Sequence, residues 1–223
     1  MAELKAGLFD LDGVLVDSHR LHYRSWQQLA DELGLDFDEK RGDTYRGMER
    51  YECMRVMFEE FNHRPAPDKQ TIHELTERKN KYYQELLTHA TAADLILPGA
   101  VELLAALKAA KVRIVVASGS KNAHTVIDRA GIRSYLDAIV DRHDVVDTKP
   151  DPAIFLKALE KAQVPARNAV GVEDATLGVE SLRRAGIKAI GIGHYVLDTP
   201  ADLLVDSIRE LTVAKMQRVL ADA

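Results

Sequence analysis

From residue 98 onward, short apolar runs alternate with segments of helical periodicity. The predicted strands cover residues 112–117, 138–140, 169–172 and 189–192. The predicted helices cover residues 101–110, 121–130, 152–162 and 176–185. Apolar strands that alternate with helices are typical of a parallel sheet covered on both faces. The sequence therefore predicts an α/β protein with a doubly wound parallel-sheet core of the Rossmann-like class.

An earlier apolar strand is expected at residues 6–9, but no helix returns directly from it to the sheet. The segments of helical periodicity that follow it cover residues 19–33, 51–61 and about 71–87. The simplest arrangement is an all-helical cap, residues 17–93, inserted after the first strand. Residues 1–16 and 94–223 then form the α/β core.

Three carboxylates, Asp10, Asp12 and Asp17, lie in the otherwise apolar stretch of residues 8–18. An isolated ionised carboxylate is costly to bury, so such a cluster normally accompanies a cation, a metal ion or a chemical task. Asp10 and Asp12 are two residues apart, which puts their side chains on one face of a strand, and Gly13 allows a sharp exit from it. The pattern predicts a divalent-ion site at this strand end.

The composition limits the kinds of partner. The 223 residues are 46% hydrophobic and carry a formal net charge of -5, which gives no basic excess for binding nucleic acid. No apolar run approaches the roughly 18 residues of a membrane span, and the N-terminus has no signal-peptide pattern. Cys53 is the only cysteine, so an internal disulfide is impossible. We expect a cytoplasmic protein that binds neither nucleic acid nor a membrane.

Polar residues follow four of the predicted strands. They are Asp10, Asp12, Ser118, Ser120, Lys121, Asn122, Lys149, Glu173 and Asp174. Because ligands of an open parallel sheet bind beyond the carboxyl ends of its strands, we expect these residues to meet in one crevice. Phosphoryl transfer to an aspartate requires groups of these kinds: a carboxylate pair, a loop with hydroxyl and amide groups, a lysine and a second acidic pair.

The residues at these strand ends resemble the four motifs of the haloacid dehalogenase superfamily, in order and over nearly the whole chain. The matching pieces are Asp10-Leu11-Asp12-Gly13-Val14, Ser118, Lys149-Pro150 and Glu173-Asp174. The resemblance implies that Asp10 is the nucleophile and Asp12 the general acid and base. It also implies that Ser118 and Lys149 bind the phosphoryl group. Taken alone, Ser118 is equally typical of a helix cap, and a lysine before proline is equally typical of a solvated loop.

The same resemblance implies a Mg2+ site formed by Asp10, Asp12, Glu173 and Asp174, to which Asp12 contributes its backbone carbonyl. A divalent cation suits this chemistry because it neutralises an anionic phosphate as the carboxylate approaches it. Lys149 offsets further charge on the phosphoryl oxygens. The expected cofactor is therefore Mg2+.

Further residues resemble the β-phosphoglucomutase family. The matching positions include His22, Trp26, Arg46-Gly47, Arg50, Arg78-Lys79-Asn80, Ser120, Lys121 and Asn122. The resemblance implies that His22 and Lys79 position the general acid and base, and that Arg50, Ser120 and Asn122 hold a second phosphate. Gly47, Trp26 and Lys121 are further candidate substrate-binding residues.

Each cap residue also has a structural interpretation. His22 lies on an apolar helical stripe, where a buried core histidine is common. Lys79 can extend its stem over apolar surface and keep its ammonium in water. Trp26 is typical of packing. Two segments depart from the family pattern: Glu49, where a smaller hydroxylated residue is common, and residues 175–177, which lack the usual serine.

The expected function is that of a magnesium-dependent phosphohexomutase, a monomer that acts on a small phosphorylated sugar. It would interconvert β-glucose 1-phosphate and glucose 6-phosphate through phospho-Asp10 and a sugar bisphosphate. A sugar-phosphate phosphatase is the first alternative, because it uses the same nucleophile. A dehalogenase needs neither magnesium nor Asp12, so the acid pair argues against it. A non-enzymatic magnesium-binding module predicts binding without turnover.

Overall fold

The computed structural model describes residues 3–45 and 48–221. The chain divides into two compact units. One unit, called the core below, comprises Met1–Asp17 and Thr91–Ala223, and the other, called the cap, comprises Ser18–Ala90. The cap is thus a single segment of the chain, inserted between two segments of the core.

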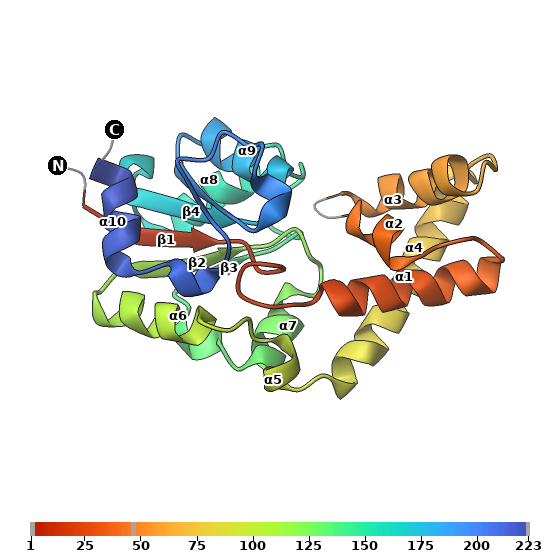
Figure 1. The fold of residues 1–223 in the computed structure, drawn as a ribbon, viewed down its shortest axis with the longest axis horizontal. Coiled ribbons are helices and arrows are strands. Elements are labelled where there is room, and N and C mark those ends of the chain that lie inside the picture. Colours follow the sequence, from red (N-terminus) through yellow and green to blue (C-terminus); the bar gives the residue numbers. More distant parts are fainter. Residues whose placement is uncertain (1–2, 46–47, 222–223) are drawn as a thin grey trace. The chain divides into compact units, whose positions relative to one another are not determined.

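The core contains a six-stranded parallel sheet (Figure 1). Its strands are β1 (Ala6–Phe9), β2 (Arg113–Ala117), β3 (Ala138–Val140), β4 (Ala169–Glu173), β5 (Lys188–Ile192) and β6 (Leu203–Val205). The spatial order is β3-β2-β1-β4-β5-β6, and every neighbouring pair is parallel. The central position of β1 explains why its four residues are all buried. The predicted doubly wound parallel sheet is confirmed.

Helices cover both faces of this sheet. The core helices are α5 (Ala92–Leu95), α6 (Ala100–Ala109), α7 (Ala123–Ala130), α8 (Ala153–Ala162), α9 (Thr176–Arg184) and α10 (Val213–Ala221). The helices α8 and α9 lie on one face of the sheet, and α6 and α10 lie on the other (Figure 1). Short 3-10 turns occupy Arg133–Tyr135, Ala166–Asn168, His194–Val196 and Ile208–Glu210. With both faces covered, the strands require apolar side chains on each side, as the sequence pattern indicated.

Among the described residues of the cap, every regular element is a helix. Its elements are α1 (His19–Leu33), α2 (Glu39–Asp43), α3 (Arg50–Val56), a π-helical turn (Met57–Phe61) and α4 (Lys69–His89). The longest two, α1 and α4, pack against each other. The apolar faces of the helices enclose a separate cluster that includes Trp26, Leu29, Met54, Met57 and Ile72. The cap therefore has its own hydrophobic centre.

The helix expected at residues 51–61 is α3 followed by the π-helical turn Met57–Phe61. Within the core, α7 begins at Ala123 rather than at residue 121, because residues 118–122 form a loop. The strand β6 and the helix α10 extend the core beyond the segments that the sequence pattern had identified.

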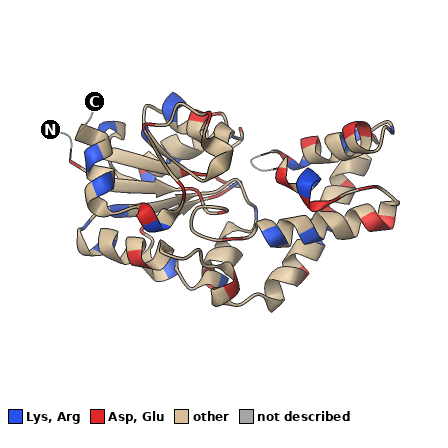
Figure 2. Ribbon diagram, in the orientation of Figure 1, with Lys and Arg blue, Asp and Glu red and all other residues tan. Residues whose placement is uncertain are grey.

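Lysine and arginine are interspersed with aspartate and glutamate along the helices of both units (Figure 2). Among the residues that the structure describes, no helix combines the length and the apolar composition that a membrane span requires.

Candidate active site

Asp10 lies directly beyond the carboxyl end of β1. Its backbone N–H donates to the Val172 carbonyl of β4 at 3.0 Å, so the neighbouring strand fixes its position. The chain then turns back through Gly13, whose φ of 86° suits a residue without a side chain. The Gly13 N–H closes this turn by donating to the Val16 carbonyl at 2.7 Å. Asp12 is therefore held in a tight turn beyond the carboxyl end of β1.

Lys149 reaches the end of the sheet from the segment between β3 and α8. Its Nζ donates to Asp10 Oδ1 and to Glu173 Oε1, both at 2.5 Å, and to the Ala117 carbonyl at 3.3 Å. The side chains of Lys149, Asp10 and Glu173 are only 13%, 11% and 1% exposed. The structure thus brings together Asp10 after β1, Glu173 at the end of β4 and Lys149 from the segment between β3 and α8. Lys149 is a largely enclosed ion-pair partner and not a solvated loop residue.

Glu173, the last residue of β4, is fixed from its other side by the backbone. Its Oε2 accepts hydrogen bonds from the N–H groups of Asp174 and Ala175, at 3.0 and 3.2 Å. With Oε1 on Lys149, both carboxylate oxygens have donors. Asp174 follows immediately and is also buried, at 8% exposure.

Lys149 and three further carboxyl groups act on Asp10 in this site. Burial raises the pKa of Asp10 well above its ordinary value, and the charges of Glu173, Asp174 and Asp12 raise it further, whereas Lys149 lowers it. Burial likewise raises the pKa of Glu173, against the opposing effect of Lys149. For Lys149, burial lowers the pKa, but the two carboxylates outweigh that effect and raise it overall. Lys149 Nζ thus pairs with two of the four carboxylates, Asp10 and Glu173.

This group of carboxylates fits a divalent cation of the Mg2+ type. The residues that would hold it are Asp10 and Asp174, with the Asp12 carbonyl and Glu173 beside them, and all of these offer the oxygen atoms that Mg2+ prefers. Within the described ranges, no three histidine, cysteine or acidic side chains are placed to hold a metal ion together. That finding is compatible with Mg2+, which is usually bound by one or two carboxylates together with water and substrate phosphate.

The loop after β2 is organised by its own hydroxyl groups. Ser118 Oγ accepts the N–H of Ser120 at 3.1 Å, and Ser120 Oγ accepts the N–H of Asn122 at 3.2 Å. Such local bonds compete with helix formation, which explains why α7 begins only at Ala123. Ser118 and Asn122 are buried, whereas Lys121 is exposed. The hydroxyl and amide groups of the loop therefore stand where the sheet ends.

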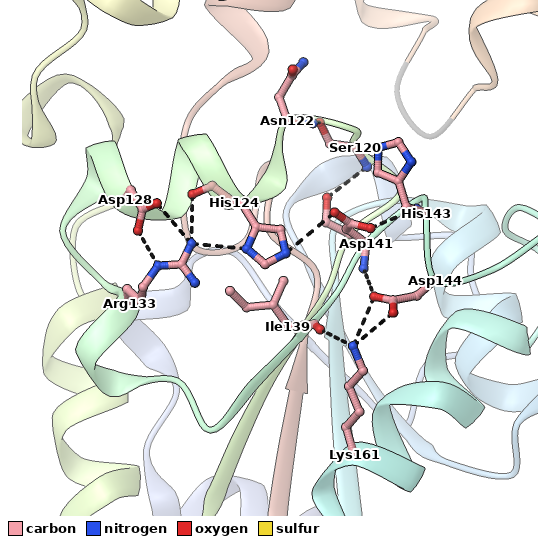
Figure 3. Close-up of polar contacts among 11 residues, drawn as sticks. Ser120, Asn122, His124, Asp128, Arg133, Ile139, Asp141, His143, Asp144 and Lys161 are labelled. Atoms are coloured by element: carbon pink, nitrogen blue, oxygen red, sulfur yellow. Dashed lines mark hydrogen bonds and ion pairs between the residues drawn. The ribbon is translucent and has the colours of Figure 1, made fainter.

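A second polar network joins this loop region to the end of β3. Figure 3 shows His124, in the first turn of α7, pointing toward Asp141, with 3.7 Å between Nε2 and Oδ2. On the other side of the ring, Nδ1 lies 3.2 Å from Arg133 Nη2. Arginine only donates, so a hydrogen bond between these two atoms requires Nδ1 as the acceptor. The contact between His124 and Asp141 connects the residue that follows β3 to α7, which itself follows the loop of residues 118–122.

The cap brings His22 and Lys79 together from α1 and α4. The distance from Lys79 Nζ to His22 Nδ1 is 2.8 Å. An ammonium only donates, so Nδ1 accepts and the ring proton of neutral His22 lies on Nε2. Burial lowers the pKa of His22 well below its ordinary value, and the positive charges of Lys79, His19 and Arg50 lower it further. His22 is therefore neutral at pH 7, with a defined tautomer.

The remaining predicted cap residues have different surroundings. Arg50 begins α3, and its Nη1 is buried with no hydrogen-bond partner among the described residues. Burial lowers its pKa, against the opposing charges of Glu77 and Glu49. Trp26 is 4% exposed and packs in the cap cluster, with Lys79 Nζ 4.8 Å from its ring centroid. Its contact with substrate stays a prediction. Gly47 lies outside the described residues.

Comparison with known proteins identifies the family. A family model described as haloacid dehalogenase-like hydrolase matches residues 4–186. The chain belongs to the haloacid dehalogenase-like hydrolases. The superfamily resemblance inferred from the strand-end motifs is thereby confirmed.

This haloacid dehalogenase-like chain is similar to enzymes of two named kinds. It is 34% identical to a β-phosphoglucomutase of Bacillus subtilis over 214 residues, which cover 94% of this chain and 92% of the relative. It is 26% identical to a phosphorylated carbohydrates phosphatase of Thermotoga maritima, covering 98% of this chain and 99% of the relative. The crystal structure of β-phosphoglucomutase from Clostridium difficile has a TM-score of 0.89 at 33% identity and covers 98% of each chain.

Two aromatic residues of the haloacid dehalogenase-like chain contact the candidate site residues and were not identified from sequence. Phe155 lies beneath Lys149, with 5.0 Å from Nζ to the ring centroid. Tyr83 stacks on His22 at a centroid distance of 4.2 Å. Tyr83 lies four residues after Lys79 on α4, so the helical spacing was the available signal. No sequence spacing relates Phe155 to Lys149 in the same way, because an irregular loop separates them.

Proposed function

We propose that this chain is a magnesium-dependent phosphohexomutase that interconverts β-glucose 1-phosphate and glucose 6-phosphate. The observation that carries the proposal is buried Asp10, paired with Lys149 and surrounded by further carboxylates, in a chain whose cap also holds the His22–Lys79 pair. The similarity to β-phosphoglucomutases extends over both units. The core set transfers the phosphoryl group, and the cap set binds the sugar phosphate.

The first half-reaction starts from phosphorylated Asp10. The sugar hydroxyl at carbon 6 attacks the phosphorus, the bond from phosphorus to the Asp10 oxygen breaks, and Asp12 takes the hydroxyl proton. The products are free Asp10 and the 1,6-bisphosphate. Lys149, which donates to Asp10 in the free protein, is well placed to stabilise the carboxylate that is released.

The second half-reaction reverses the roles at the other end of the bisphosphate. An Asp10 oxygen attacks the phosphorus at carbon 1, and the bond to the sugar oxygen breaks. Asp12 returns its proton to that oxygen, so glucose 6-phosphate leaves and phospho-Asp10 is restored. Charge on Asp10 is essential here, and the ammonium of Lys149 opposes the effect of burial on its pKa.

Mg2+ supplies charge neutralisation, because a divalent ion reduces the repulsion between the phosphate and the approaching carboxylate. Asp10, Asp174 and the Asp12 carbonyl would hold it, with Glu173 beside them. Ser118 and the loop that ends at Asn122 donate to phosphoryl oxygens.

The cap supplies a cationic and a neutral donor. Arg50 has a buried guanidinium nitrogen suited to a phosphate that is not reacting. His22 carries its proton on Nε2, so it donates a hydrogen bond without bringing a second positive charge beside Lys79. By the resemblance to β-phosphoglucomutases, His22 and Lys79 position the general acid and base, Asp12.

A sugar-phosphate phosphatase is the second candidate. It is favoured by the similarity to the phosphorylated carbohydrates phosphatase of Thermotoga maritima, which covers nearly all of both chains. Both activities use Asp10 as the nucleophile. They differ in whether a sugar hydroxyl or water accepts the phosphoryl group from Asp10.

The deciding assay offers the purified protein β-glucose 1-phosphate, Mg2+ and a trace of glucose 1,6-bisphosphate. Glucose 6-phosphate is followed by a coupled dehydrogenase, and inorganic phosphate is followed in the same samples. We expect glucose 6-phosphate to form in large excess over phosphate, and omission of the bisphosphate to introduce a lag.

Two controls complete the assay. Asp10→Asn removes the nucleophile at constant size and should form neither product. Lys215→Met changes an exposed lysine of the core and should behave as the unchanged protein. Release of phosphate without glucose 6-phosphate would reject the mutase in favour of the phosphatase, and the absence of both products would favour a binding module.

A further inference from the structure

Gly178 lies inside α9, where glycine is less favourable than any ordinary residue except proline. Its φ is not positive, so the backbone at this position accepts any residue. The local conformation therefore does not explain the glycine. The reason must lie in what a side chain at residue 178 would meet.

A side chain there would meet the carboxylate of Glu173. A Cβ atom built on Gly178 lies 1.9 Å from Glu173 Cδ and Oε1, and 2.4 Å from Oε2. These distances are far below any van der Waals contact, so the two groups cannot occupy their places together. Oε1 is the atom that accepts the hydrogen bond from Lys149.

The conflict falls on one side chain and not on the helix. The Glu173 atoms in conflict, Cδ, Oε1 and Oε2, are the end of a side chain and can move, whereas the backbone of α9 is held by its own hydrogen bonds. If Glu173 moves, it loses Lys149 and the two backbone donors at residues 174 and 175. Lys149 then keeps only Asp10 as a carboxylate partner.

We infer that Gly178 is a positioning residue: by lacking a side chain it leaves the space in which the Glu173 carboxylate binds Lys149 and so sets the position of the lysine against Asp10. The inference rests on the proposed function only in treating this lysine as part of the phosphoryl site. Its structural content, the coupling of Gly178 to Glu173 and Lys149, is independent of the sugar.

The test compares Gly178→Ala, Glu173→Asp and the double variant. Aspartate withdraws the carboxylate by about one carbon–carbon bond, ~1.5 Å, which relieves the contact with a Cβ at residue 178. The first readout is Mg2+-dependent hydrolysis of p-nitrophenyl phosphate, which needs no sugar. The second is the ammonium nitrogen resonance of Lys149 in labelled, metal-free protein.

We expect Gly178→Ala alone to lower hydrolysis by about 10- to 100-fold, because that factor corresponds to the loss of charged hydrogen bonds. The same variant should shift the Lys149 resonance. In the Glu173→Asp background, the same substitution should change hydrolysis by less than about threefold, because that carboxylate no longer occupies the space. If Gly178→Ala alone does not fold while the double variant does, the steric conflict is likewise confirmed.

Gly171→Ala is the matched control. A Cβ at that position meets Leu182 Cδ2 at 2.0 Å, so it disturbs the same strand and helix without touching a carboxylate. It should lower the thermal stability and leave the Lys149 resonance in place. The inference is overturned if Gly178→Ala lowers hydrolysis equally with Glu173 and with Glu173→Asp. It is also overturned if both variants that carry Gly178→Ala fail to fold, or if the Lys149 resonance does not move in Gly178→Ala. If the sugar assay fails while the coupling holds, only the mutase proposal falls.

Discussion

Substituting Lys149 by methionine tests the charge balance of the site most directly. Methionine keeps most of the apolar stem and removes the ammonium, whose nitrogen lies over the Phe155 ring. Asp10 and Glu173 each lose a hydrogen bond of 2.5 Å, and both stay buried. Removing one partner of a buried ion pair typically costs about 3–5 kcal/mol, because the other partner is left uncompensated. We expect a loss of that size in metal-free protein.

Urea unfolding in EDTA, followed by circular dichroism, measures this loss. A change of about 3–5 kcal/mol corresponds to a fall in Tm of roughly 6–20 °C for a chain of this size. Lys215→Met is the control, because its ion pair with Glu210 is exposed on both sides and contributes at most about 1 kcal/mol. Lys149→Met combined with Glu173→Gln should recover part of the loss, since one buried charge is then removed.

The pH dependence of Lys149→Met follows from the direction of the pKa shifts. Burial raises the pKa of Asp10 and of Glu173 above their ordinary values of 3.8 and 4.5, and Lys149 opposes both shifts. Between the ordinary pKa values, which apply to the unfolded chain, and the raised pKa values of the folded protein, the folded state holds protons that the unfolded state has released. The free energy of unfolding therefore falls as pH rises through this window. Without Lys149 the window extends to higher pH. A loss below about 1 kcal/mol at pH 7, or one that grows as pH falls through this window, would refute the reasoning.

Three further outcomes are expected. Asp12→Asn should lower kcat for phosphoryl transfer by about 10²–10⁴-fold, the usual contribution of a general acid and base, and an unchanged kcat in the coupled assay would remove Asp12 from that role. Lys79→Ala should reduce isomerisation of β-glucose 1-phosphate more than any hydrolysis, and equal losses would argue against a role in positioning the general acid and base. In NMR titrations the pKa of His22 should lie well below 6.5 and rise in Lys79→Met without reaching 6.5, because burial is the larger cause; a value at or above 6.5 in the unchanged protein contradicts the contacts of His22.

The sequence pattern located most elements of the core closely. The predicted strand at residues 138–140 coincides with β3, and the predicted strands at 169–172 and 189–192 differ from β4 and β5 by one residue. Apolar β-branched runs flanked by helices are a strong local signal, because a strand buried on both faces has no polar side to present. The three-residue strand β6 has no such signal, and pairing with β5 defines it.

The candidate site was predictable as a set of residue types but not as a set of partners. Asp10, Ser118 and Glu173 were selected because each follows an apolar strand. That they lie close together depends on the order β2-β1-β4 at the centre of the sheet, which strand spacing does not specify. Lys149 illustrates the difference: its position before a proline is typical of a solvated loop, yet it is largely enclosed between two carboxylates.

By itself the sequence determined the fold class, predicted an all-helical cap at residues 17–93 and located carboxylates at the strand ends, because periodicity and residue type are local properties. Only the tertiary structure decided which charged and polar groups pair with one another. It paired Lys149 with Asp10 and Glu173, joined His22 to Lys79 across 57 residues, and left Gly178 as the space for a carboxylate. The physical reason is that burial and ion pairing depend on contacts between distant segments, which no local pattern specifies.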